Sequence, residues 1–183
     1  EGFLRVYNLS QNGKLLNVIN SETILEVELE TPLFPNETTE FTMDFVGQVP
    51  DLVRRAGKNS REGIEYSMAQ WYPKMCEYDL EGWNADPYTG REFHGVWGNF
   101  DVKIKIDKEY VVAASGYLQN ADKIGMGYSK RKNPKVKKGK VEWHFVAPNV
   151  HDFTWSADKD YLHDTYPGPN EVTLHFFYKN DPK

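Results

Sequence analysis

The stretch FDVKIKID, residues 100–107, decides the fold class, because apolar and charged side chains alternate along it with a period of two. Val102, Ile104 and Ile106 occupy every second position, and lysines stand between them. Successive side chains of a β-strand point to opposite faces, so this pattern predicts a strand with one buried face and one wet face. We expect the three apolar side chains in the core.

Similar patterns occur elsewhere along the chain. Phe41, Met43 and Phe45 share one face of EFTMDFVGQVP, and we expect them in the core as well. Asn12-Gly13 separates two apolar runs near the N-terminus and predicts a hairpin turn, since both residues tolerate positive φ. No helical period extends beyond about three turns. Together with the runs TILEVELE, YVVAASGYLQN, KVEWHFVAPNV and EVTLHFFY, these segments predict a mainly β protein.

Length and composition predict a single β domain over residues 1–183. The chain is 39% hydrophobic and 27% charged, which is typical of a globular protein with a substantial core. No apolar run approaches the roughly 20 residues that cross a bilayer, so we expect no membrane span. Cys76 is the only cysteine, and a disulfide within the chain is therefore excluded.

Seven Lys or Arg residues crowd residues 130–140, the most basic segment of the chain. Asn133-Pro134 and Gly139 mark this run as a loop, and no aromatic residue is interleaved to stack on bases. The whole chain nevertheless has a net charge of −5, so the remainder is acidic enough to repel a phosphate backbone. We interpret the run as a solvated hairpin tip and expect no nucleic-acid partner.

The sequence contains no complete catalytic or metal-binding motif. Neither H-E-x-x-H nor G-x-S-x-G occurs, and no Gly-rich loop is suited to phosphate binding. Four histidines fall in the C-terminal third, but the closest two are seven positions apart, whereas zinc sites usually contain a closer pair. We therefore expect no catalytic residue and no metal ligand in this chain, and no cofactor bound to it. The histidines are His144, His151, His163 and His175.

Five phrases of the sequence resemble, in their order, the N-terminal domain of zinc metallopeptidases of the aminopeptidase N family, the gluzincins, in the form common among bacteria. The resemblance spans most of the chain, and the combination is more specific than any one phrase. The phrases are FVGQVP at 45–50, QWYPKM at 70–75, EFHGVWGNFDV at 92–102, VVAASGYLQN at 111–120 and DFTWSADKDY at 152–161.

This resemblance implies a twisted, saddle-like antiparallel β-sheet or sandwich domain that precedes a catalytic domain. In the family, the catalytic domain holds zinc through H-E-x-x-H and a downstream glutamate, and neither that motif nor the family's G-x-M-E-N-like strand occurs here. The chain is then a non-catalytic fragment whose partners are its own catalytic domain, which carries the zinc, and a peptide substrate. A periplasmic or secreted location is expected for the parent metallopeptidase.

The resemblance also implies two substrate-binding residues. Gln70 matches a family glutamine whose segment reaches the catalytic cleft. Tyr72 stands where many relatives carry the Glu or Gln that receives the amine of the substrate, and its phenol is neutral near pH 7. If residues 70–72 form a strand, both side chains point to one side and Trp71 packs on the other. The alternative for Gln70 is a buried amide that hydrogen-bonds strand backbone.

Two other functions compete with this interpretation. A carbohydrate-binding β-sandwich explains the five Trp and eleven Tyr residues, because exposed aromatic faces stack on sugars. An exposed coplanar aromatic trio favours that function. A purely structural interaction domain is the second alternative, and the position of Gln70, facing a cleft or the interior, distinguishes it from the peptidase domain.

Overall fold

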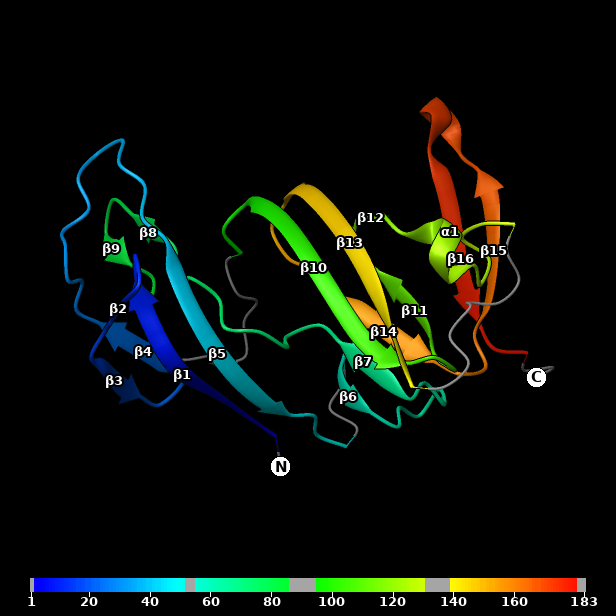
Figure 1. Cartoon of the computed structure of the whole chain (residues 1–183), viewed down its shortest axis with the longest axis horizontal. Coiled ribbons are helices and arrows are strands. Elements are labelled where there is room, and N and C mark those ends of the chain that lie inside the picture. Colours follow the sequence, from blue (N-terminus) through cyan, green and yellow to red (C-terminus); the bar gives the residue numbers. More distant parts are fainter. Residues whose placement is uncertain (1, 52–54, 86–94, 131–138, 181–183) are drawn as a thin grey trace. The chain divides into compact units, whose positions relative to one another are not determined.

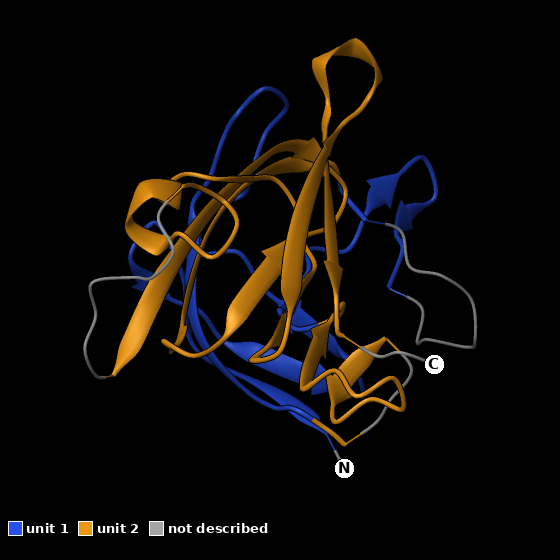
Figure 2. Cartoon of the chain, turned by 90° about the vertical axis from the view of Figure 1, so that its right-hand side faces the viewer, with its two compact units in different colours: residues 1–49, 71–96 blue, residues 50–70, 97–183 orange. Residues whose placement is uncertain are grey.

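The computed structural model describes residues 2–51, 55–85, 95–130 and 139–180. The fold class is mainly β, as the alternating patterns predict, with antiparallel strand pairs throughout the named sheets. The chain divides into two compact units, residues 1–49 with 71–96 and residues 50–70 with 97–183 (Figures 1 and 2). A single domain over 1–183 stays a prediction, and each unit is described by itself.

Unit 1 is built on a three-stranded sheet of order β2-β1-β5. Asn12 and Gly13 form the predicted turn between β1 and β2, with φ of 48° and 84°. A β-bulge interrupts the pairing of β1 with β5 between Tyr7 and Ser10, where Asn8 also has positive φ. The strands are β1 Phe3–Gln11, β2 Lys14–Leu15, β5 Phe41–Gln48, and the hairpins β3 Val18–Ser21 with β4 Ile24–Val27 and β8 Tyr78–Asp79 with β9 Gly82–Trp83.

The core predicted on β5 is wrong in part. Met43 and Phe45 share a face, but they are 39% and 37% exposed, while Phe41 is half-buried. Alternation identifies which side chains share a face, and it does not tell whether another layer covers that face. Phe45 contacts the ring of Trp71 at a centroid distance of 6.3 Å.

Unit 2 contains two larger sheets and a separate hairpin, β15–β16 (Figure 1). One sheet has the order β10-β13-β12 and the other the order β11-β14-β7-β6. The elements are β6 Ala56–Lys58, β7 Tyr66–Met68, β10 Gly98–Asp107, β11 Val111–Ala114, β12 Tyr117–Leu118, α1 Ala121–Ile124, β13 Lys140–Val150, β14 Trp155–Asp158, β15 Leu162–Pro167, the 3₁₀ turn Pro169–Glu171 and β16 Thr173–Tyr178.

The predicted alternation on β10 is confirmed. Ile104 is buried, Val102 and Ile106 are half-buried, and the intervening lysines are exposed. Ile104 lies opposite Trp143 of β13 in the antiparallel register. The most deeply buried apolar side chains of unit 2 surround this strand pair and the β11–β14 pair: Val112, Ile124, Trp143, Phe145, Ala147, Phe153 and Ala157.

Candidate functional site

Gln70 lies just beyond β7, which ends at Met68. Its side chain is exposed, and its amide nitrogen donates a hydrogen bond to Oδ2 of Asp152 at 3.3 Å. The other oxygen of Asp152 accepts the backbone N–H of Phe153 at 2.8 Å, which fixes the carboxylate. The alternative of a buried amide bonded to strand backbone is therefore wrong, because Gln70 bonds a carboxylate at the surface.

Tyr72 belongs to unit 1, whereas Gln70 ends a segment of unit 2. The ring of Tyr72 packs edge-on against Trp71 at 5.1 Å, and the ammonium of Lys74 lies 5.3 Å from its centroid. The condition that residues 70–72 form a strand is not met, since no strand lies between Met68 and Tyr78, a segment described throughout. Pro73, which lacks a backbone N–H, falls within this irregular segment. Substrate binding by Gln70 and Tyr72 stays a prediction.

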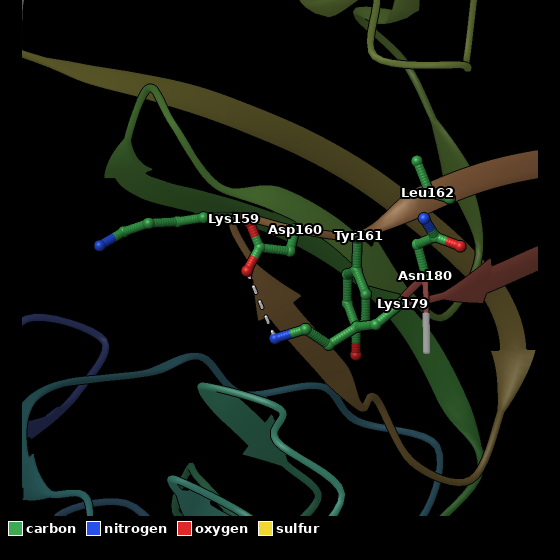
Figure 3. A pocket seen from close by; sticks show the side chains of 6 residues that line it. All are labelled: Lys159, Asp160, Tyr161, Leu162, Lys179 and Asn180. Carbon is green, nitrogen blue, oxygen red and sulfur yellow. Dashed lines mark ion pairs between the residues drawn. The ribbon is translucent and has the colours of Figure 1, made fainter. Parts of the chain in front are cut away.

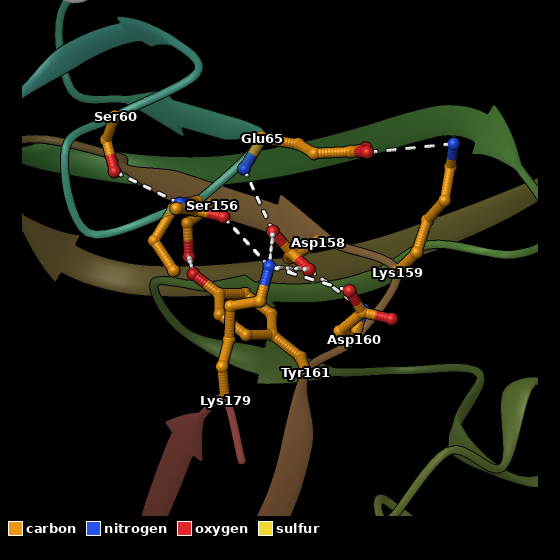
Figure 4. Close-up of polar contacts among 10 residues, drawn as sticks. Ser60, Glu65, Ser156, Asp158, Lys159, Asp160, Tyr161 and Lys179 are labelled. Atoms are coloured by element: carbon orange, nitrogen blue, oxygen red, sulfur yellow. Dashed lines mark hydrogen bonds and ion pairs between the residues drawn. The ribbon is translucent and has the colours of Figure 1, made fainter. Parts of the chain in front are cut away.

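A buried carboxylate that sequence reasoning missed organises one end of unit 2 (Figure 4). Asp158 closes β14 and is 1% exposed. Its oxygens accept the backbone N–H groups of Glu65 at 2.9 Å and of Asp160 at 2.8 Å, and the ammonium of Lys179 at 3.1 Å. Lys179 also donates to the carbonyl of Gly63 at 2.8 Å. These bonds join the loop before β7, the end of β14 and the chain after β16.

Charge and hydrogen bonds stabilise the ionised form of Asp158. Burial acts to raise the pKa of Asp158, but the N–H groups of Asp160 and Glu65 and the ammonium of Lys179 outweigh burial. The pKa of Asp158 therefore lies below its ordinary value. The hydrogen bond to Asp158 in turn raises the pKa of Lys179.

A shallow pocket of about 450 Å³ lies beside this carboxylate (Figure 3). Its cationic groups are already paired: Lys179 binds Asp158 and Asp160, and Lys159 lies 3.7 Å from Glu65. These pairs leave the pocket poorly suited to bind an anion, and we assign its polar lining a structural role. The lining residues are Lys159, Asp160, Tyr161, Leu162, Lys179 and Asn180.

Two of the four histidines meet in space. His163 of β15 and His175 of β16 lie on one face of the hairpin, with Nε2 of His163 2.8 Å from Nδ1 of His175. His144 instead pairs with Asp101 at 2.8 Å, and His151 packs against the ring of Trp97. Within the described ranges, no group of three or more His, Cys, Asp or Glu is placed to hold a metal ion.

The opposite face of the β15–β16 hairpin is apolar and exposed. The register Leu162↔Tyr178 to Pro167↔Thr173 places five apolar side chains on this face, with Asp164 among them. The phenol of Tyr178 donates to Asp164 at 2.5 Å, so the single carboxylate on this face is hydrogen-bonded. We call this surface the outer face; its apolar members and their exposed fractions are Leu162 44%, Tyr166 65%, Leu174 39%, Phe176 50% and Tyr178 44%.

No protein-family model, curated protein or solved structure matches the chain. In the part of the chain that the structure describes, no helix is long and apolar enough to cross a membrane. Most of the basic run, residues 131–138, lies outside the described residues.

Proposed function

We propose that this chain is the non-catalytic N-terminal β domain of a zinc-dependent metallopeptidase of the aminopeptidase type. In this proposal it packs on the catalytic domain, which holds the zinc, and borders the pocket for the peptide substrate. The mainly β fold and the five family-like phrases support the assignment. One phrase, DFTWSADKDY, supplies the fully buried Phe153 and the buried carboxylate Asp158, so it belongs to the structural framework.

The outer face of the β15–β16 hairpin carries the proposal of a docking domain. Five apolar side chains on one face, each at least 39% exposed, form a surface typical of a contact with another domain. In the natural metallopeptidase, Phe176→Glu should weaken the association with the catalytic domain and lower the melting temperature of the whole protein. Tyr78→Glu, at a 66% exposed position on β8 that is not part of the hairpin, is the matched control. An unchanged melting temperature in the Phe176 variant contradicts docking through this face.

Zinc analysis tests the non-catalytic assignment. After dialysis, residues 1–183 alone should retain well below one zinc per chain and should hydrolyse no aminoacyl substrate, because the chain lacks the H-E-x-x-H ligands. The natural protein that contains this domain should hold zinc and lose peptidase activity with a chelator. One tightly bound zinc per isolated chain, or a natural protein without zinc-dependent activity, contradicts the proposal.

Substrate binding by Gln70 and Tyr72 is tested by kinetics of the natural protein. Loss of one neutral hydrogen bond costs about 0.5–1.5 kcal/mol, so Gln70→Ala and Tyr72→Phe should each lower kcat/KM by about two- to tenfold. The melting temperature should change little, since Gln70 is exposed. Trp71→Ala is the comparison variant and should mainly lower the melting temperature, because Trp71 packs against Phe45 and Tyr72. Unchanged hydrolysis of substrates with free and blocked N-termini by both variants refutes the two roles.

The aromatic members of the outer face favour a second candidate function, carbohydrate binding. Tyr166, Phe176 and Tyr178 share one face of the hairpin and are 44–65% exposed, which suits stacking on sugar rings. Affinity electrophoresis in gels that contain soluble polysaccharides separates the two functions. Retardation that Tyr166→Ala abolishes supports the sugar module, and migration equal to that in polysaccharide-free gels supports the peptidase domain.

A further inference from the structure

The β15–β16 hairpin contacts the rest of unit 2 through its inner face and its end. Its strands pair with each other and form a sheet of their own among the described residues. A lone two-stranded hairpin is marginally stable in water and needs packing against another element. Because its outer face is exposed, the contacts of the inner face and the Lys179–Asp158 pair at its end determine how firmly it is held.

The inner face meets the segment that follows α1. Nδ1 of His163 lies 3.2 Å from the backbone oxygen of Met126, and the Tyr128 ring is tilted against the His163 ring at a centroid distance of 4.4 Å. Gly127, with φ of 84°, leaves room for the imidazole, since a Cβ there would lie 2.6 Å from Nδ1 of His163. The lack of a side chain at Gly127 therefore lets the His163 imidazole lie directly against the backbone.

The hydrogen bonds define a single arrangement of protons. A carbonyl only accepts, so Nδ1 of His163 donates to Met126. The Nε2 atom of a neutral His163 is then bare and accepts from Nδ1–H of His175 at 2.8 Å. The Nε2 atom of His175 is then unprotonated. A first added proton binds this atom and leaves both hydrogen bonds, His175 to His163 and His163 to Met126, intact.

A second proton has no acceptable place in this arrangement. It must bind Nε2 of His163, which then directs an N–H at the N–H of His175 and places two positive rings in contact. Two other ionisable groups act on the pair: Tyr128, whose ring contacts both imidazoles, and Asp164, which lies on the opposite face of the hairpin. Burial raises the pKa of Tyr128, which stays neutral and donates to the Val112 carbonyl, and Asp164 already accepts the Tyr178 hydroxyl.

We propose that His163, His175 and the Met126 carbonyl form a proton-sensitive latch. The latch holds the β15–β16 hairpin against the rest of unit 2 and releases it when both imidazoles are protonated. Release exposes the inner aromatic contacts of Phe177 with Tyr128 while the Lys179–Asp158 pair still tethers the end of the hairpin. The latch is thus a conformational device separate from the proposed docking role of the outer face.

The direction of the pH effect follows from the surroundings of His163. Burial lowers the pKa of His163, the neighbouring His175 lowers it further, and the Met126 hydrogen bond and Asp164 only partly oppose them. A group whose pKa is lower in the folded state than in the unfolded state contributes its full stabilisation when the pH is above the unfolded-state pKa. For His163 that unfolded-state pKa is 6.5. This stabilisation is lost as the pH falls from that value through the lower folded-state pKa, so the latch opens on acidification.

Hydrogen exchange of the hairpin amides tests the latch. After correction for intrinsic exchange rates, protection of β15 and β16 in the wild-type chain should fall by at least about tenfold between about pH 7.5 and pH 5. His175→Gln should lose less protection than the wild type over this range, because the amide either donates a hydrogen bond to Nε2 of His163 or accepts one from it, whereas the burial of His163 remains. His144→Gln, on β13 and paired with Asp101, should behave like the wild type. The proposal is overturned if protection of the hairpin amides in the wild type is the same at both pH values. It is also overturned if His175→Gln loses as much protection as the wild type.

A measurement on the unmodified chain keeps the test independent of any variant. The imidazole ¹⁵N chemical shifts near neutral pH should identify His163 as the Nδ1–H tautomer, since Nδ1 donates to the Met126 carbonyl. Shifts that place the proton on Nε2 of His163 overturn the proposal even if His175→Gln fails to fold.

Discussion

Asp158→Ala is expected to lower the free energy of unfolding by about 2–5 kcal/mol, because it removes the acceptor for two backbone N–H groups and the partner of Lys179. The carboxylate is 1% exposed, so water cannot readily take its place. Urea denaturation of the variant and the wild type at neutral pH measures this difference.

Asp160→Ala is the matched control for this prediction. Its carboxylate also pairs with Lys179, at 3.6 Å, but it is 79% exposed. Exposed ion pairs typically contribute about 0–1 kcal/mol, so this variant should stay close to the wild type. Equal losses of unfolding free energy in Asp158→Ala and Asp160→Ala contradict a special role for the buried carboxylate.

The lowered pKa of Asp158 predicts that the folded state loses stability in acid. Its pKa in the folded state lies below the ordinary 3.8, so the stabilisation is present above that value and is lost as the pH falls through the folded-state pKa. The gap in unfolding free energy between wild type and Asp158→Ala should therefore be constant near neutrality and narrow below about pH 4. The response of the histidine latch instead begins as the pH falls below 6.5.

Local sequence patterns predict those features of the fold that depend on neighbours along the chain. The alternation of Val102, Ile104 and Ile106 predicts β10 and its buried face, and Asn12-Gly13 predicts the first turn. These predictions succeed because strand periodicity and positive φ are properties of a few consecutive residues.

Burial and clustering depend on partners far along the chain, and there the sequence is insufficient. Met43 and Phe45 follow the same periodicity as β10, yet both remain more than one-third exposed. His163 and His175 meet only because the hairpin register places them diagonally on one face, and no spacing rule predicts that register. Asp158 stands among ordinary acidic residues, and its burial follows from the pairing of β14 with β7 and from Lys179.

The buried aromatic cluster of unit 2 should govern its stability more than any other apolar group. Phe145 on β13 is fully buried and lies 6.3 Å from Trp143 and 6.4 Å from both Tyr128 and Phe153, measured between ring centroids. Truncation of a buried Phe costs about 3–5 kcal/mol through lost transfer free energy and the cavity left behind. Phe145→Ala should therefore lower the urea midpoint strongly with little change in the m-value.

Phe176→Ala gives this prediction a control of identical chemistry, because it removes the same atoms from a side chain that is 50% exposed on the outer face of the hairpin. An exposed position leaves no closed cavity, and the expected loss is within about 1 kcal/mol. The contrast between the two variants isolates burial from side-chain type. If Phe145→Ala and Phe176→Ala destabilise the chain equally, the aromatic cluster around β13 is not the core of unit 2, and the hairpin contributes as much to stability as the sheet.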